Sequence, residues 1–94
     1  MDARVRRAVL AKIDETVSNT AEIAKIRKSL NLISAQSNED FRLGIAIGRI
    51  YNSFHYQTRR ILKRSSTDEE FSEFVDILAS RASEIRDALS REQP

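Results

Sequence analysis

The clearest fold signal lies in residues 67–90, which read TDEEFSEFVDILASRASEIRDALS. Apolar side chains recur there in steps of four, three, four, three and four residues, at Phe71, Val75, Leu78, Ala82, Ile85 and Leu89. Such spacing is typical of one face of an amphipathic α-helix. Thr67 and Glu70 have the spacing of a capping box, in which each side chain binds the backbone N–H of the other residue. The segment therefore predicts a helix that begins near Thr67, ends near Ser90 and buries this stripe.

Two further segments have helical periodicity. The first runs from about Ala3 to Ser34, with apolar residues at every third or fourth position. Its middle, residues 18–20, contains the poor helix formers Ser, Asn and Thr. One long helix is favoured here, while a kink or a split near 18–20 stays open. The second segment runs from about Glu39 to Arg64, after a polar cluster in which Ser37 is the expected N-cap.

Short polar segments near 35–38 and 65–67 separate the three expected helices. Helices that are joined by only a few residues become antiparallel neighbours. We therefore predict an all-α fold, an up-down-up antiparallel three-helix bundle with long helices. With 94 residues, of which 40% are apolar, the chain is long enough for one hydrophobic core but not for two, so residues 1–94 are expected to form a single helical domain.

Composition excludes several classes of protein. The chain has no Cys, which excludes disulfides, a thiol nucleophile and a cysteine metal site, and it has a single His. Its longest apolar stretch, residues 43–48, is far shorter than the roughly 18 residues that a membrane span requires. Lys12 interrupts the first apolar run too early for a signal peptide. We expect a cytoplasmic protein that does not associate with membranes.

The second expected helix is apolar almost all round in its first half. Aligned on Ile47, Phe54 and Ile61, it turns one face inward, made of Gly44, Ile47, Gly48, Tyr51, Phe54, His55, Thr58, Ile61 and Leu62. Four other apolar residues then lie off the core face: Leu43, Ile45, Ala46 and Ile50. They are predicted to form a protein interface, because contiguous exposed apolar residues usually mark contacts. The alternative is that the long first helix covers them.

Gly44 and Gly48 lie on one face of this helix, four residues apart. A glycine inside a helix costs about 1 kcal/mol relative to alanine, so the pair requires a compensating contact. Close packing inside the bundle is the favoured explanation, and close approach of another chain is the alternative.

The opposite face of the same helix is basic and aromatic. It carries Arg42, Arg49, Asn52, Tyr56, Arg59, Arg60 and Lys63. Cations that neutralise phosphates and a tyrosine that stacks on bases are what a nucleic-acid surface needs. Residues 1–64 hold 13 Lys and Arg against 6 Asp and Glu, whereas residues 65–94 hold 3 against 8. Helix capping is the alternative for the last cations, which lie where the negative end of the helix dipole attracts them.

Candidate catalytic groups are weak. Glu70, Glu73, Glu84 and Asp87 have the spacing of metal-binding pairs, but all four belong to one helix and are expected on its solvated face. His55 lies one turn from Tyr51 and Thr58, with no nucleophile or carboxylate nearby in sequence. We therefore predict no enzymatic activity, no catalytic residues, no metal site and no cofactor.

These patterns favour a small non-enzymatic helical interaction module or accessory subunit of a larger complex. It would contact a protein partner, or a second copy of itself, through the apolar half of the second helix. The alternative is a nucleic-acid-binding protein that uses the basic and aromatic face.

Overall fold

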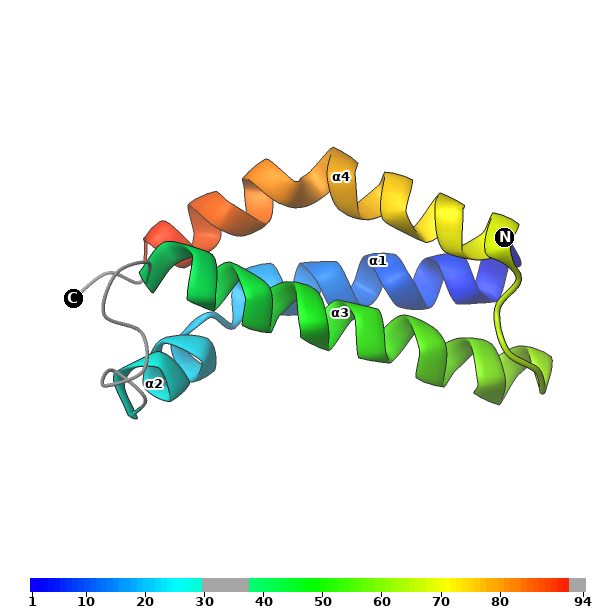
Figure 1. Ribbon diagram of the computed structural model, residues 1–94, viewed down its shortest axis with the longest axis horizontal. Helices are drawn as coiled ribbons and strands as arrows, with labels where there is room; N and C mark the ends of the chain where they lie inside the picture. The colour runs from blue at the N-terminus through cyan, green and yellow to red at the C-terminus, as the bar shows by residue number, and fades with distance from the viewer. Residues whose placement is uncertain (30–37, 92–94) are drawn as a thin grey trace.

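A computed structural model describes residues 1–29 and 38–91 of the chain. These residues form four α-helices and no strand: α1 (Ala3–Ser18), α2 (Ala21–Ser29), α3 (Asn38–Leu62) and α4 (Asp68–Ser90) (Figure 1). The all-α prediction is confirmed, but the prediction of three helices is wrong. The expected end of the first helix at Ser34 and the expected N-cap Ser37 lie outside the described residues.

The first predicted helix is split in two at Asn19 and Thr20. Asn19 leaves the helical region, with φ −135° and ψ 64°. The chain then turns, so that α2 leaves the line of α1 (Figure 1). The turn buries Thr20 and Ile23 to 5% and 0% exposure. Poor local helix propensity makes the break inexpensive, and burial of Ile23 offsets it. The favoured single long helix is therefore wrong, and the split that was left open near 18–20 is what occurs.

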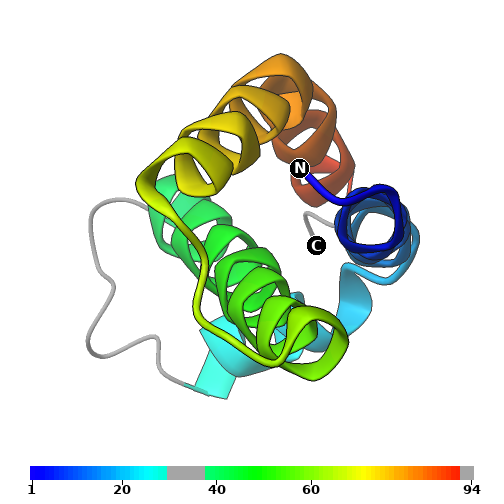
Figure 2. The ribbon, with the colours of Figure 1, turned by 90° about the vertical axis from the view of Figure 1, so that its right-hand side faces the viewer.

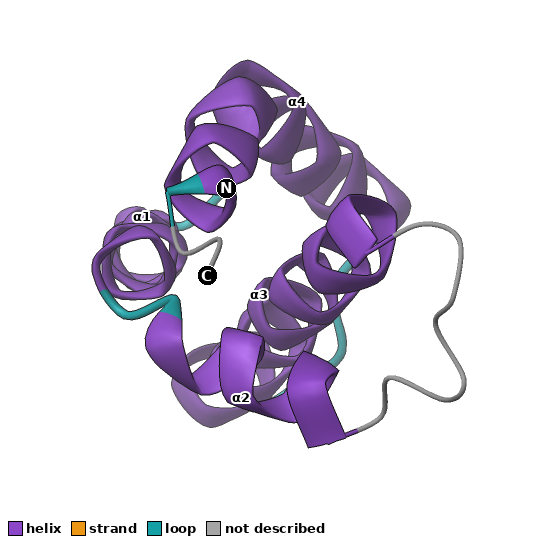
Figure 3. Cartoon of the chain, turned by 90° about the vertical axis from the view of Figure 1, so that its left-hand side faces the viewer, coloured by secondary structure: helices purple, strands orange, loops and turns teal. Residues whose placement is uncertain are grey.

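Three long helices lie side by side and alternate in direction. α1 and α4 run in the same direction, and α3 runs antiparallel to both (Figure 1). Seen along the helices, α1, α3 and α4 surround a common interior, with α2 against α3 (Figure 2). Figure 3 gives the opposite end view, in which α2 closes the side between α1 and α3.

Apolar side chains of all four helices meet in this interior. Phe54 of α3 and Phe74 of α4 stack with ring centroids 4.3 Å apart and planes inclined by only 8°. Around them lie the other buried apolar residues: Val5, Val9, Ile13, Ile23, Ala46, Ile50, Ile77, Ile85, Ala88 and Leu89. Full burial of one such aliphatic or aromatic side chain contributes about 1.5–3 kcal/mol, so this cluster holds the helices together.

α3 turns a different face to the core than its sequence suggested. Its buried positions follow one another at steps of four residues: Arg42, Ala46, Ile50, Phe54 and Thr58, each at most 2% exposed. The expected inward residue Tyr51 is instead 44% exposed. The alignment on Ile47, Phe54 and Ile61 was therefore rotated by part of a turn. Periodicity could not select the face because the first half of α3 is apolar nearly all round.

α4 begins as predicted. The hydroxyl of Thr67 accepts from the Glu70 N–H at 3.1 Å, and the Thr67 N–H donates to the Glu70 carboxylate at 2.9 Å. The guanidinium of Arg64 also binds this carboxylate at 2.8 Å. The hydrogen bond from Arg64 is the main reason that the pKa of Glu70 is lowered to about 2, and the hydrogen bond from the Thr67 N–H is the second. The connection from α3 to α4 is thus fixed by one acid with two partners.

Candidate functional site

An apolar surface lies along the outer side of α3 and α4. We call it the α3–α4 face and define it by residues that share one side of each helix: Gly44, Ile47, Gly48, Tyr51 and His55 of α3, with Phe71, Val75, Leu78 and Ala82 of α4. α1, α3 and α4 surround the core (Figure 2). The face is marked by side chains of α3 and α4 that stay exposed beside it. It contains no Asp, Glu, Lys or Arg.

Large apolar side chains are exposed on this face. Tyr51 is 44% exposed, Val75 is 43% exposed and Phe71 is 37% exposed. The rings of Tyr51 and Phe71 meet edge to face with centroids 6.2 Å apart. His55 lies against both rings, with its centroid 4.6 Å from that of Tyr51 and 6.0 Å from that of Phe71. The face therefore contains a joined aromatic cluster that is open to solvent.

Gly44 and Gly48 add a flat area beside this cluster. A Cβ atom built on either glycine would meet no described atom within 4 Å. Neither glycine has a positive φ, so backbone conformation does not require them. The favoured expectation, that they allow close packing inside the bundle, is wrong. Their helix cost of about 1 kcal/mol each is not offset by any contact among residues 1–29 and 38–91.

The four residues predicted as a protein interface divide into two pairs. Ala46 and Ile50 are 0% exposed and belong to the hydrophobic core. Leu43 and Ile45 are partly buried and pack against that core. The assignment of Ala46 and Ile50 to a free surface is therefore corrected, because the face of α3 that turns inward contains them. The exposed apolar surface lies further round the helix, at Tyr51.

Phe71 and Val75 were expected in the core, but 37% and 43% of their surfaces are exposed. α4 carries two neighbouring apolar stripes, and the stripe with Phe74 and Ile77 takes the core position. The stripe that begins with Phe71 and Val75 packs against the core at Leu78 and is fully buried only at Ile85 and Leu89. The signal in the sequence was the presence of more apolar positions in this helix than one buried stripe can use.

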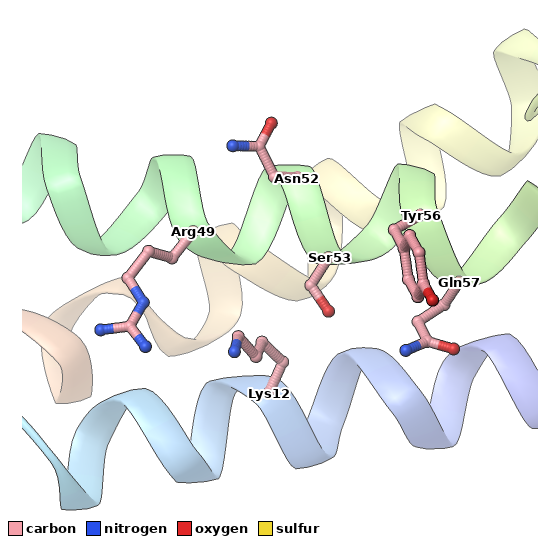
Figure 4. A pocket seen from close by; sticks show the side chains of 6 residues that line it. All are labelled: Lys12, Arg49, Asn52, Ser53, Tyr56 and Gln57. Carbon is pink, nitrogen blue, oxygen red and sulfur yellow. The ribbon is translucent and has the colours of Figure 1, made fainter.

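The basic and aromatic residues of α3 are only partly together. Three of them, Arg49, Asn52 and Tyr56, border an open depression of about 410 Å³ between α1 and α3 (Figure 4). Ser53 and Gln57 of α3 and Lys12 of α1 complete its lining. Arg49 extends toward α1 in this view, whereas Asn52 points away from it.

The cations of this depression already form ion pairs with carboxylates. Arg49 binds Glu22 at 3.1 Å and lies 3.8 Å from Glu15, while Lys12 binds Glu15 at 3.2 Å. A phosphate would have to compete with both acids. The depression is therefore a poor anion site.

Arg42 does not lie on the outer face at all. Only 2% of the residue is exposed, and its Nη1 donates to the carbonyl oxygen of Leu89 at 3.0 Å. Leu89 belongs to the last turn of α4, where backbone donors are scarce and the Arg91 N–H is shared between the Asp87 and Leu89 carbonyls. The guanidinium therefore caps α4 and meets the negative end of its dipole. Its assignment to a nucleic-acid stripe is corrected.

The remaining cations of the stripe stay at the surface. Arg59, Arg60 and Lys63 are exposed, and no described carboxylate pairs with them within 4.0 Å. Tyr56 is 63% exposed. Lys63 has φ 60°, so it ends α3 in the left-handed conformation.

Three of the four acids considered for catalysis, Glu70, Glu73 and Glu84, have structural partners. Glu70 closes the capping box, and Glu84 binds Arg81 at 2.7 Å, which lowers the pKa of Glu84 through that hydrogen bond. Within the described ranges no three His, Asp or Glu side chains gather as a metal site would require. Over the same ranges, no helix combines the length and the apolar character needed to cross a membrane.

No protein-family model, curated protein or solved structure matches the chain.

Proposed function

We propose that the chain is a small non-enzymatic helical interaction module, or accessory subunit, that binds a protein through its α3–α4 face. The observation that carries this proposal is the exposure of Tyr51, Phe71 and Val75 side by side on a face without charged residues. Single exposed apolar side chains are ordinary on protein surfaces. Contiguous ones that form a patch are typical of contact sites.

The composition of the face also supports a protein contact. Aromatic residues are enriched in the centre of interfaces, where they bury a large area at a small cost in side-chain entropy. The two glycines beside them provide a surface without side chains, onto which another helix can pack closely. Large exposed side chains beside an empty helix surface are suited to interlock with a partner.

Nucleic-acid binding stays as the second candidate, because Tyr56 is 63% exposed and three cations of α3 lack ion pairs with described acids. It is the weaker proposal. Arg42 is buried and Arg49 is paired with Glu22, so two of the seven residues assigned to the stripe do not support it.

Site-directed photo-crosslinking tests the first proposal. The full chain is expressed in its native host with p-benzoylphenylalanine in place of Val75, and in a matched control with the same residue in place of Arg7, an exposed position of α1. We expect the Val75 position to give one dominant protein adduct on irradiation and the Arg7 position to give none. Equal crosslinking from both positions, or none from either, would refute the proposal.

A further inference from the structure

We propose that the partner of the α3–α4 face is a second copy of this chain, with the two α3 helices packed antiparallel about a two-fold axis. This inference rests on the proposed function. It identifies the occupant of the face from the order of residues along α3 and from their charges.

α3 carries two neighbouring rows of residues, each with a spacing of four. Gly48 and His55 are half-buried, and the other members of the rows are exposed. One row consists of Asp40, Gly44 and Gly48, an acid followed by two positions without side chains. The other row consists of Tyr51, His55 and Arg59, two rings followed by a cation. Rows with a spacing of four form ridges on a helix surface, and helices that cross at a small angle keep such rows in contact over several turns.

The two rows are complementary when the helices are antiparallel. If Tyr51 of one copy lies on Gly48 of the other, a step of four residues along each helix places His55 on Gly44. The next step places Arg59 against Asp40. A large side chain thus faces an empty position twice, and the cation faces the acid, all in one register.

Two-fold symmetry makes every one of these contacts occur twice. In a closed two-fold interface the same patch serves both copies, so the row of rings on each copy covers the row of glycines on the other. Tyr51, with 44% of its surface exposed in one chain, would become buried. A Cβ on either glycine meets no described atom within 4 Å in one chain, so a second copy would supply the close contact that offsets their cost.

Charge favours this orientation over a parallel one. The exposed acids of α3, Glu39 and Asp40, lie in its first turn, and the exposed cations Arg59 and Arg60 lie in its last turn. Antiparallel packing places opposite charges together at both ends, whereas parallel packing would place like charges together. Neither Asp40 nor Arg59 is in an ion pair with another described residue, so both are available to a second copy.

Sedimentation equilibrium of the purified full chain gives the first test. We expect twice the 10.8 kDa mass of one chain at a concentration of about 100 µM. Gly48→Leu should weaken the dimer at least about tenfold, because the side chain occupies the space that Tyr51 needs. The fold should persist, since a Cβ at this position meets no described atom and leucine favours the helix. Ala11→Leu, at an exposed position of α1, is the matched control and should leave the dimer unchanged.

A charge exchange tests the register. Asp40→Arg alone and Arg59→Glu alone should each raise the dissociation constant several-fold, because like charges then face each other twice. The double variant Asp40→Arg with Arg59→Glu should recover most of the loss. Arg7→Glu alters the charge equally on α1 and should have no effect. Circular dichroism of each variant checks that helicity is retained, since both changes on α3 oppose its dipole.

The outcomes separate this inference from the proposed function. A monomeric wild-type chain at about 100 µM overturns self-association, while a crosslink from position 75 to a different protein would still support an interaction module. A dimer that tolerates Gly48→Leu overturns the assignment to this face. A dimer that Gly48→Leu disrupts, but whose two charge variants do not rescue each other, overturns the register.

Discussion

Replacing Arg42 by alanine distinguishes a capping residue from a nucleic-acid contact. In the structure this guanidinium lies in the interior and binds the carbonyl of Leu89 in the last turn of α4. The variant Arg42→Ala removes the donor and leaves that carbonyl buried. It also removes the aliphatic part of the side chain from between α3 and α4. The expected effect is therefore on the free energy of unfolding.

The magnitude follows from two losses and one gain. A hydrogen bond from a charged donor contributes about 1.5–3 kcal/mol. The two methylene groups lost beyond Cβ contribute about 0.8 kcal/mol each. The variant no longer has to strip water from a guanidinium, which offsets part of both terms. A net loss of about 2–3 kcal/mol remains, compared with the roughly 5–14 kcal/mol total stability typical of a chain of this length.

Urea unfolding followed by circular dichroism measures this loss. The comparison variant is Arg49→Ala, whose side chain is 26% exposed and binds surface acids, and which should lose no more than about 1 kcal/mol. All variants are compared at one chain concentration, since self-association adds to apparent stability. If Arg42→Ala unfolds within about 0.5 kcal/mol of the wild type, the side chain does not cap α4 and the reasoning fails.

Three further predictions concern the end of α3 and the start of α4. Arg64 lowers the pKa of Glu70 to about 2, so the ionised carboxylate stabilises the fold fully above pH 4.5, and this stabilisation is lost as pH falls toward 2. The free energy of unfolding, measured across this pH range, should show the loss, and Glu70→Gln should make the pH dependence weaker. Lys63→Gly should raise the free energy of unfolding by about 0.5–1 kcal/mol, and with it the thermal midpoint. The left-handed conformation at φ 60° is strained for a residue with a side chain and not for glycine. Binding to duplex DNA, if present, should fall with salt at a slope of about −2.7, from three cations including Arg59 and Arg60; a slope near −5 would mean that the buried and paired arginines also reach phosphates.

Local features of the fold could be predicted from the sequence. The apolar spacing predicted helices correctly, and the start of α4 was found because Thr67 and Glu70 bind within one turn of chain. Such signals need no knowledge of the rest of the molecule. The break at Asn19 could only be left open, since it depends on whether Ile23 enters the core. Local propensity permits that break and a distant contact decides it.

The orientation of α3 could not be predicted, for a physical reason. Its first half offers apolar residues on every side, so the hydrophobic effect alone does not select a face. The end of α4 takes part in the selection, because its last carbonyls need a donor and Arg42 supplies one. A prediction from hydrophobic spacing places every arginine at the surface, so it could not place Arg42 in the interior. The prediction that Ala46 and Ile50 were free failed with that orientation.

The chain does have more apolar residues than its core buries, but the exposed ones lie at Tyr51, Phe71 and Val75 and not at Ala46 and Ile50. A helix in a small bundle can bury one stripe, and α4 buries the stripe of Phe74 and Ile77 against its neighbours. Phe71 and Val75 stay 37% and 43% exposed beside the similarly exposed Tyr51 of α3. The ring of Phe71 joins this surface to the core, with its centroid 6.0 Å from that of Phe74. Two helices thus carry surplus apolar residues on the same side of the molecule, at one level along the bundle. Exposed apolar residues that arose independently on two helices would lie on unrelated sides of the molecule. Those of α3 and α4 lie together, with Tyr51 and Phe71 in contact, and this is the strongest reason to infer that something binds there.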